Sequence, residues 1–221
     1  MSGESPRAGP RRTVVKVCGL TRGEDAAWAL TCGADWLGFI VGAESPRRIE
    51  PERAADIVDA LEGGMPVAVM EDVSPGEALE LARRAHARRV QLHGVSPAGW
   101  PDDFPLPCAF VVGVTAAGAL VGDEPAARHL LMLDTAQAGR TGGSGRAFPW
   151  DAARPIAARR DVLLAGGLDP DNVAGAVRAL RPFGVDASSG LESSPGLKDR
   201  ERVRRFVEAV RQCEPSPERA R

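Results

Sequence analysis

Four short apolar runs of the sequence end in polar side chains that could carry acid/base chemistry. Cys18 follows the run Val14–Val17, and Asp134 follows the run Leu130–Leu133. A thiol and a carboxyl group in different surroundings can divide two proton transfers between a base and an acid. A lone cysteine at such a position is also typical of a small buried core residue. The presence of Asp134 favours the catalytic interpretation.

The other two runs end beside Gln91 and His93, and at Asp186. Side chains alternate along a strand, so Lys16 and Cys18 share one face of theirs. A lysine next to Cys18 would favour the thiolate. It could equally form a buried ion pair with Asp186, and the sequence leaves both roles open.

Two glycine-containing turns follow further apolar runs. The first holds Gly166 and Gly167, and the second holds Ser188, Ser189 and Gly190. Glycines expose backbone N–H groups, which can bind a dianion without lysine or arginine. A Gly-Gly pair alone is more often only a turn, but two such turns together favour a site for a phosphate monoester.

Two arginines and one flexible segment complete the candidate set. Arg47 and Arg48 could bind a carboxylate, because guanidinium presents a planar fork of donors. Arginine is frequent in this chain, so a solvated surface role is the alternative. The segment 142–145, Gly-Gly-Ser-Gly, is typical either of a loop that closes over a substrate or of an ordinary surface loop.

The elements that must position these residues follow a repeating pattern from Thr13 onward, in which apolar runs alternate with amphipathic segments. The pattern predicts eight strands, at Val14–Cys18, Trp36–Val41, Val67–Met70, Val90–Leu92, Ala109–Val114, Leu130–Leu133, Val162–Ala165 and Val185–Ala187. It predicts helices at Arg22–Thr31, Pro51–Leu61, Pro75–Ala85, Pro170–Leu180 and Asp199–Gln212, and shorter helices after the fourth, fifth and sixth strands. Ser74 and Asp169 each precede a proline and are expected to cap a helix that begins there.

Eight β/α repeats of this size predict an α/β fold of the (β/α)8, or TIM barrel, class as a single domain. The first strand is followed by Cys18-Gly19-Leu20-Thr21, which lacks the glycine fingerprint of a dinucleotide-binding sheet. Barrel enzymes carry their catalytic groups at the carboxyl ends of the strands, and the loops after the seventh and eighth strands often bind phosphate. Both glycine-containing turns occupy those positions.

Size and composition limit the class of protein. The 221 residues predict one barrel domain at 13–212, with a disordered N-terminal tail at 1–12 and a C-terminal tail at 213–221. The formal charge of −2 does not favour nucleic acid or anionic lipid as a partner, and no apolar stretch is long enough to span a membrane. Four scattered cysteines and three histidines indicate neither a disulfide framework nor a metal site, so we expect a cytoplasmic protein.

Together these motifs resemble the phosphoribosylanthranilate isomerase family. The resemblance runs from about Lys16 to about Val210. Its segments are Lys16-Val17-Cys18-Gly19-Leu20-Thr21, Ser45-x-Arg47, Gln91-Leu92-His93-Gly94, Leu133-Asp134-Thr135, Gly142-Gly143-Ser144-Gly145, Leu164-Ala165-Gly166-Gly167-Leu168 with Asn172-Val173, and Val185-Asp186-Ala187-Ser188-Ser189-Gly190-Leu191-Glu192 with Gly196-x-Lys198-Asp199.

The resemblance implies an Amadori rearrangement of N-(5′-phosphoribosyl)anthranilate in tryptophan biosynthesis, without cofactor or metal. It makes Cys18 the general base and Asp134 the general acid, and it makes Arg47 the ligand of the anthranilate carboxylate. His93 and Asp186 would lie near the phosphoribosyl substrate without a chemical step. The phosphate would be bound by Gly166, Gly167, Ser188, Ser189 and Gly190.

Two departures from the family pattern stand out. Met70-Glu71-Asp72 replaces a usual Phe-Val-Asn and adds a carboxylate near the barrel mouth, and Phe148-Pro149-Trp150 replaces Phe-Asp-Trp. The first departure motivates one alternative, a catalytically silent or altered-specificity paralogue that binds a phosphoribosyl metabolite. A second alternative, the related isomerase of histidine synthesis, uses an aspartate base on the first strand, and Cys18 argues against it. The sequence leaves open whether the protein is a monomer or a dimer.

Overall fold

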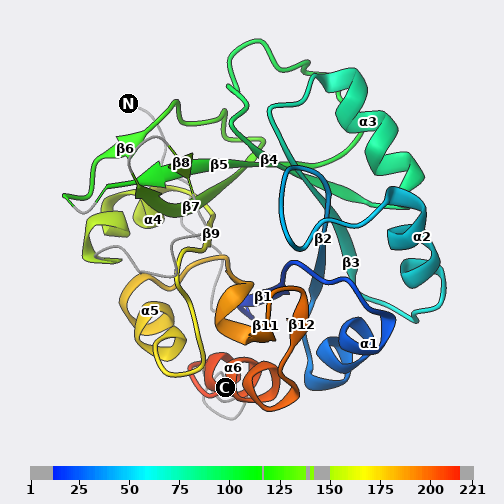
Figure 1. Ribbon diagram of the computed structural model, residues 1–221. Coiled ribbons are helices and arrows are strands. Elements are labelled where there is room, and N and C mark those ends of the chain that lie inside the picture. Colours follow the sequence, from blue (N-terminus) through cyan, green and yellow to red (C-terminus); the bar gives the residue numbers. More distant parts are fainter. Residues whose placement is uncertain (1–11, 116, 138–139, 142–149, 215–221) are drawn as a thin grey trace, which may run out of the picture.

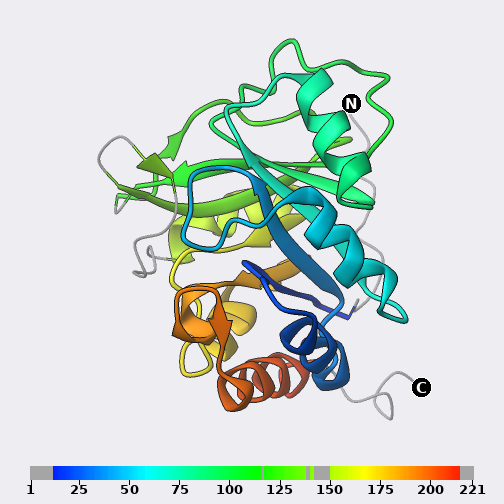
Figure 2. The same cartoon turned by 45° about the vertical axis from the view of Figure 1, so that its right-hand side comes forward.

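Eight parallel strands form a closed barrel in the computed structural model, which describes residues 12–115, 117–137, 140–141 and 150–214. The strands follow one another as β1-β2-β3-β4-β5-β7-β9-β10, and β10 pairs with β1 to close the barrel. Figures 1 and 2 show the helices arranged around the outside of this ring. The predicted fold class is confirmed.

The bounds of the elements are close to those predicted. The barrel strands are β1 (Val14–Val17), β2 (Trp36–Gly42), β3 (Met65–Glu71), β4 (Arg89–His93), β5 (Cys108–Val114), β7 (Leu130–Gln137), β9 (Val162–Leu164) and β10 (Gly184–Ala187). The helices are α1 (Gly23–Cys32), α2 (Pro51–Asp59), α3 (Pro75–Arg84), the 3-10 turn η1 (Trp150–Ala153) with α4 (Arg154–Arg159), α5 (Val173–Leu180) and α6 (Arg200–Arg211). Outside the barrel lie β6 (Leu120–Val121), β8 (Arg140–Thr141), the 3-10 turn η2 (Ser189–Leu191) and the hairpin of β11 (Glu192–Ser194) and β12 (Leu197–Lys198).

Two of the three shorter helices that the pattern predicts are absent from the described residues. The connection from β4 to β5 holds turns only, and the one from β5 to β7 holds β6. The first connection has prolines at 97, 101, 105 and 107, and proline lacks the N–H that a helix needs. The third predicted helix is present as η1 with α4.

The two predicted helix caps differ in outcome. Ser74 caps α3, since its Oγ accepts from Glu77 N at 3.3 Å while its own N–H donates to the Glu77 carboxylate. Asp169 does not cap α5, which begins at Val173. Its Oδ1 accepts instead from the N–H groups of Asp171 and Asn172, which orders a turn ahead of the helix.

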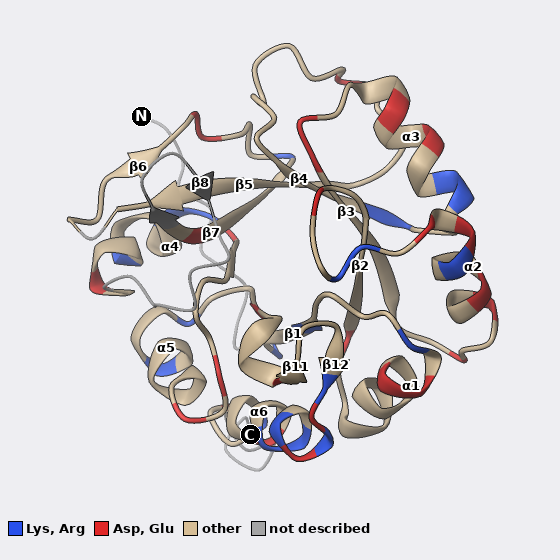
Figure 3. Ribbon diagram, viewed as in Figure 1, with Lys and Arg blue, Asp and Glu red and all other residues tan. Residues whose placement is uncertain are grey.

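The core has two parts. The larger cluster fills the space between strands and helices, and a smaller one fills the barrel with Trp36, Val67, Met132, Leu163 and Ala165. Figure 3 shows the charged positions gathered on the outer helices α2, α3 and α6, while the strands are mostly uncharged. No helix of the described part of the chain is long and apolar enough to cross a membrane.

The predicted domain limits rest partly on residues outside the description, since 1–11 and 215–221 are not described. Within the described part, Glu214 accepts a hydrogen bond from Thr13 N at 3.0 Å. The chain segments that enter and leave the barrel therefore contact each other directly after α6.

Candidate active site

Cys18 is the first residue after β1 and lies inside the barrel beside Lys16. Both are buried, with exposed fractions of 5% for Cys18 and 0% for Lys16. The neighbouring strand β2 makes room for them with Gly38: a Cβ there would lie 2.8 Å from Cys18 Sγ and 2.9 Å from Lys16 Nζ. The two side chains therefore share one interior space, as strand alternation predicts.

Lys16 joins the first and last barrel strands. Its Nζ donates to Asp186 Oδ1 at 2.8 Å, and the two residues are register partners across β1 and β10. Burial alone would lower the pKa of Lys16, but the Asp186 carboxylate and Cys18 outweigh it and raise that pKa. Of the two roles left open for Lys16, the ion pair is confirmed, and the lysine also faces Cys18.

Burial raises the pKa of the Cys18 thiol, because a thiolate is disfavoured away from water. The ammonium of Lys16 opposes this effect, the Asp186 carboxylate adds to it, and the ammonium of Lys198 opposes it more weakly. The surroundings of Cys18 thus hold cations that can stabilise a thiolate as it forms.

Asp134 lies inside β7, which continues to Gln137 beyond the expected end of the strand. Its exposed fraction is 7%, and its Oδ1 accepts from Thr135 N at 2.6 Å. Burial raises its pKa to about 6, while the Thr135 N–H acts in the opposite direction. Lys16 lowers the pKa of Asp134 as it does that of Cys18, so one buried cation acts on both groups.

The two predicted phosphate turns come together beside Asp134. Gly166 and Gly167 have φ of +84° and +66°, and a Cβ on Gly166 would lie 2.7 Å from Asp134 Oδ1. A Cβ on Gly190, which lies in η2 with Ser189, would lie 2.2 Å from the carbonyl oxygen of Leu168. Glycine is therefore required where the two turns pack on each other.

Ser188 carries a hydroxyl with unused hydrogen-bonding capacity. Its Oγ is buried and has no hydrogen-bond partner within the described ranges. A Cβ on Gly19 would lie 2.7 Å from this oxygen, so Ser188 faces the backbone directly after Cys18. Buried hydroxyl groups are normally paired, and a ligand oxygen would satisfy this one.

Arg47 and Arg48 point to different places. Arg47 binds the buried carboxylate of Glu192 through two donors, Nε to Oε1 at 2.9 Å and Nη2 to Oε2 at 2.7 Å. Lys198 Nζ also donates to Glu192 Oε1, at 2.7 Å. The exposed Arg48 lies near Glu50 instead, so only Arg47 stands next to the interior residues.

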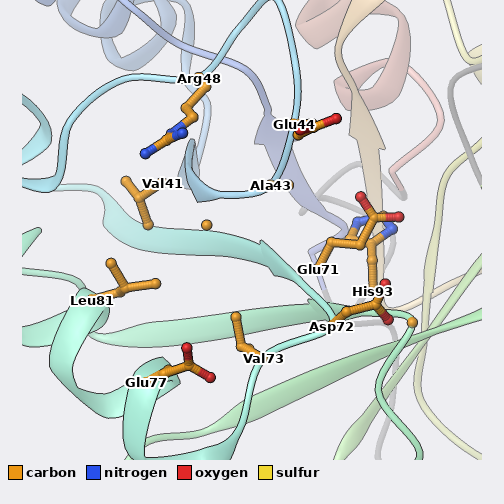
Figure 4. Close-up of a pocket in the computed structure, with 12 residues that line it drawn as sticks. Val41, Ala43, Glu44, Arg48, Glu71, Asp72, Val73, Glu77, Leu81 and His93 are labelled. Carbon is orange, nitrogen blue, oxygen red and sulfur yellow. The ribbon is translucent and has the colours of Figure 1, made fainter.

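A pocket of about 770 Å³ opens beside the barrel mouth, between the ends of β2 and β3 and the start of α3. Figure 4 shows Glu71 next to His93, its register partner on β4. His93 Nε2 lies 2.9 Å from Gln91 Nε2 inside the barrel. Cys18 and Asp134 do not line the pocket, whereas His93, another of the predicted site residues, does.

Motif spacing missed three residues of this site. Gly38, Glu192 and Lys198 shape it, although the last two stand in a motif that we quoted without assigning them a role. The charge of Glu192, five residues beyond the end of the eighth strand, was a signal, but its partner Arg47 lies 145 residues away. The predicted loop Gly142-Gly143-Ser144-Gly145 lies outside the described residues.

Comparison with known proteins gives a consistent result. The family model for N-(5′-phosphoribosyl)anthranilate (PRA) isomerase matches residues 15–209. The chain is 38% identical over 208 residues to the N-(5′-phosphoribosyl)anthranilate isomerase of Trichlorobacter lovleyi, covering 90% of this chain and 98% of that protein. It is 40% identical over 210 residues to the protein of the same name from Rubrobacter xylanophilus, covering 89% and 98%.

Solved structures agree. Phosphoribosyl anthranilate isomerase from Thermotoga maritima superposes with a TM-score of 0.79 at 32% identity, covering 90% of this chain and 99% of that one. A phosphoribosyl anthranilate isomerase in complex with reduced 1-(o-carboxyphenylamino)-1-deoxyribulose 5-phosphate gives 0.77 at 31% identity, with the same coverage. The chain belongs to the N-(5′-phosphoribosyl)anthranilate isomerase family.

Proposed function

We propose that this chain isomerises N-(5′-phosphoribosyl)anthranilate to 1-(2-carboxyphenylamino)-1-deoxyribulose 5-phosphate in tryptophan biosynthesis, with Asp134 as general acid and Cys18 as general base. The support for this reaction is that the chain belongs to the isomerase family. The observation that carries the two roles is the burial of a thiol and a carboxyl group in one barrel, with the ammonium of Lys16 beside the thiol. The isomerisation itself needs neither an oxidant nor a reductant.

The first step opens the sugar ring. Asp134 donates its proton to the furanose ring oxygen, the C1′–O bond breaks, and the nitrogen lone pair forms a protonated Schiff base. A pKa of about 6 keeps a useful fraction of Asp134 protonated near neutral pH, because burial disfavours its carboxylate.

The second step moves a proton from carbon. The Cys18 thiolate removes the proton from C2′, and the electron pair of that C–H bond forms C1′=C2′ while the Schiff base becomes an amine. The enol then loses its O–H proton and gains one at C1′, which gives the ketose. Proton exchange with solvent returns Cys18 to the thiolate and Asp134 to the acid.

Different elements would bind the two anionic ends of the substrate, the anthranilate carboxylate and the phosphate. Arg47 would bind the anthranilate carboxylate with guanidinium donors that Glu192 leaves unused. Gly166, Gly167, Ser188, Ser189 and Gly190 would bind the phosphate, with the unpaired Ser188 hydroxyl as one donor. His93 and Asp186 would border the substrate between these ends.

Turnover of freshly made N-(5′-phosphoribosyl)anthranilate, followed by loss of anthranilate fluorescence, tests the roles. Cys18→Ala and Asp134→Asn should each lower kcat by about 10²–10⁴-fold, the usual worth of a positioned acid or base. Cys108→Ala is the matched control, because Cys108 is equally buried but begins β5 at the opposite end of the barrel. Near-normal turnover in either active-site variant would reject its assignment, and an inactive wild type would favour a silent paralogue.

The proposal also places the enzyme in the cytoplasm with a small-molecule phosphoribosyl substrate as its partner. Its four cysteines are free thiols in the structure, which suits a reducing compartment.

A further inference from the structure

Glu192 stands between two cations that come from different parts of the chain. It is the first residue of β11, and its exposed fraction is 6%. Arg47 reaches it from the loop after β2, and Lys198 reaches it from β12, where it is the register partner of Glu192. Gly196 N also donates to Glu192 Oε1, at 3.3 Å.

The contact fixes the orientation of Arg47. A guanidinium has five N–H donors. Glu192 takes the donor on Nε and one on Nη2, which occupies one edge of the planar group and leaves the Nη1 donors for another ligand. A bidentate pair of this kind allows little rotation of the guanidinium.

The position of Arg47 matters because its stem lies against the backbone that follows the base. A Cβ on Gly19 would lie 2.7 Å from Arg47 Cδ, and Gly19 has φ of +69°. Arg47 is therefore held between Glu192 on one side and the residue next to Cys18 on the other. Its exposed side-chain fraction of 20% leaves part of the group open to a ligand.

The charges of the cluster also hold Arg47 in place beside Glu192. Arg47 and Lys198 would repel each other without an anion between them. Hydrogen bonds from both cations outweigh burial and lower the pKa of Glu192, so it stays a carboxylate. Lys198 also donates to the carbonyl oxygen of Ser188 at 3.2 Å, which connects the cluster to one of the phosphate turns.

We propose that Glu192 is a positioning residue, which acts through Arg47 to orient its free donors toward the substrate carboxylate. This rests on the proposed function, in which Arg47 binds that carboxylate. A purely structural role, in which Glu192 only holds the β11–β12 hairpin through Lys198 and Gly196, is the competing explanation.

A double-mutant cycle separates the two explanations. KM and kcat for N-(5′-phosphoribosyl)anthranilate are measured for the wild type, Glu192→Gln, Arg47→Met and the double variant. Each single substitution should raise KM about tenfold with a much smaller change in kcat, and the double variant should be no worse than Arg47→Met, because coupled residues are not additive. Thermal melts check that each variant is folded.

Glu124→Gln is the matched control. Glu124 is a partly buried carboxylate that also binds two cations, Arg159 and Arg160, but it lies in the segment leading into β7 at the other end of the barrel. Its KM should match that of the wild type.

Three outcomes overturn the inference, and they are distinguishable. If the KM effects of the two substitutions multiply in the double variant, Glu192 does not act through Arg47. If Glu192→Gln lowers the melting temperature and leaves KM unchanged, its role is structural. If the wild type neither turns over the substrate nor binds reduced 1-(o-carboxyphenylamino)-1-deoxyribulose 5-phosphate in calorimetric titrations, the proposed function fails and the inference fails with it.

Discussion

Cys18 and Asp134 are both buried, and burial raises the pKa of each because it disfavours the thiolate and the carboxylate. The proposed reaction uses the charged form of Cys18 and the neutral form of Asp134. Burial therefore favours the acid and opposes the base. Lys16 counteracts part of the second effect, because its ammonium lowers the pKa of Cys18, which still stays above its ordinary value.

The raised pKa of Asp134 predicts a gain in stability when its charge is removed. Its pKa is about 6 in the folded protein against an ordinary value of 3.8. Ionising it therefore costs stability, in an amount that grows as the pH rises through this window and is complete above pH 6. At about 1.4 kcal/mol per pKa unit, the free energy of unfolding of Asp134→Asn should exceed that of the wild type by about 3 kcal/mol near pH 8.

Chemical denaturation near pH 8 and near pH 5 measures this difference. The gain should be about half as large near pH 5, because the native wild type is then mostly protonated. Asp123→Asn, at an exposed position, should change the stability little at either pH. A stability gain for Asp134→Asn that is equal at both pH values, or a loss at both, would contradict the assigned cause.

At the scale of the elements, the capping box of α3 gives a prediction that is independent of the active site. Ser74→Ala removes the oxygen that accepts from Glu77 N and should cost about 1 kcal/mol of stability, with kcat and KM unchanged. Thermal or denaturant unfolding measures it. Ser96→Ala is the control, because the Ser96 hydroxyl accepts from Ala98 N in a loop and caps no helix of the described chain. Equal costs in the two variants would show that capping of α3 is not the cause.

The same scale shows what the sequence predicts well. All eight barrel strands lie where apolar runs predicted them, because a strand buried on both faces must be apolar along most of its length. The short helices predicted after β4 and β5 were wrong. The amphipathic pattern of these connections was outweighed by the prolines between 97 and 107 and by the glycines at 118 and 122. The start of α5 was predicted three residues too early, at Pro170 in place of Val173. An aspartate such as Asp169, which accepts from the N–H groups that follow it, orders a turn as readily as a helix.

At the scale of the whole molecule, barrel closure decides which residues meet. The ends of strands at the barrel mouth predicted that Cys18, Asp134 and Asp186 would lie near one another. The contact of Arg47 with Glu192 could not be predicted in that way, because neither belongs to a barrel strand and a loop contact depends on the path of both loops. The space that Gly38 leaves for the side chains of Lys16 and Cys18 also depends on the register of β1 and β2.

Closure also gives the last prediction, which concerns the ion pair between β1 and β10. Lys16 and Asp186 are 170 residues apart and both buried. Breaking a buried pair from one side leaves a charge without a partner, so Lys16→Met should cost about 3–5 kcal/mol of unfolding free energy. The second substitution Asp186→Asn, made in Lys16→Met, removes that charge and should recover much of the loss. Urea denaturation of the wild type, both single variants and the double variant measures the coupling. Arg84→Met, which breaks an exposed pair with Glu52, should cost less than about 1 kcal/mol. A double variant that is less stable than Lys16→Met would show that the uncompensated charge of Asp186 is not the source of the cost, and that Asp186 stabilises the barrel through contacts other than Lys16.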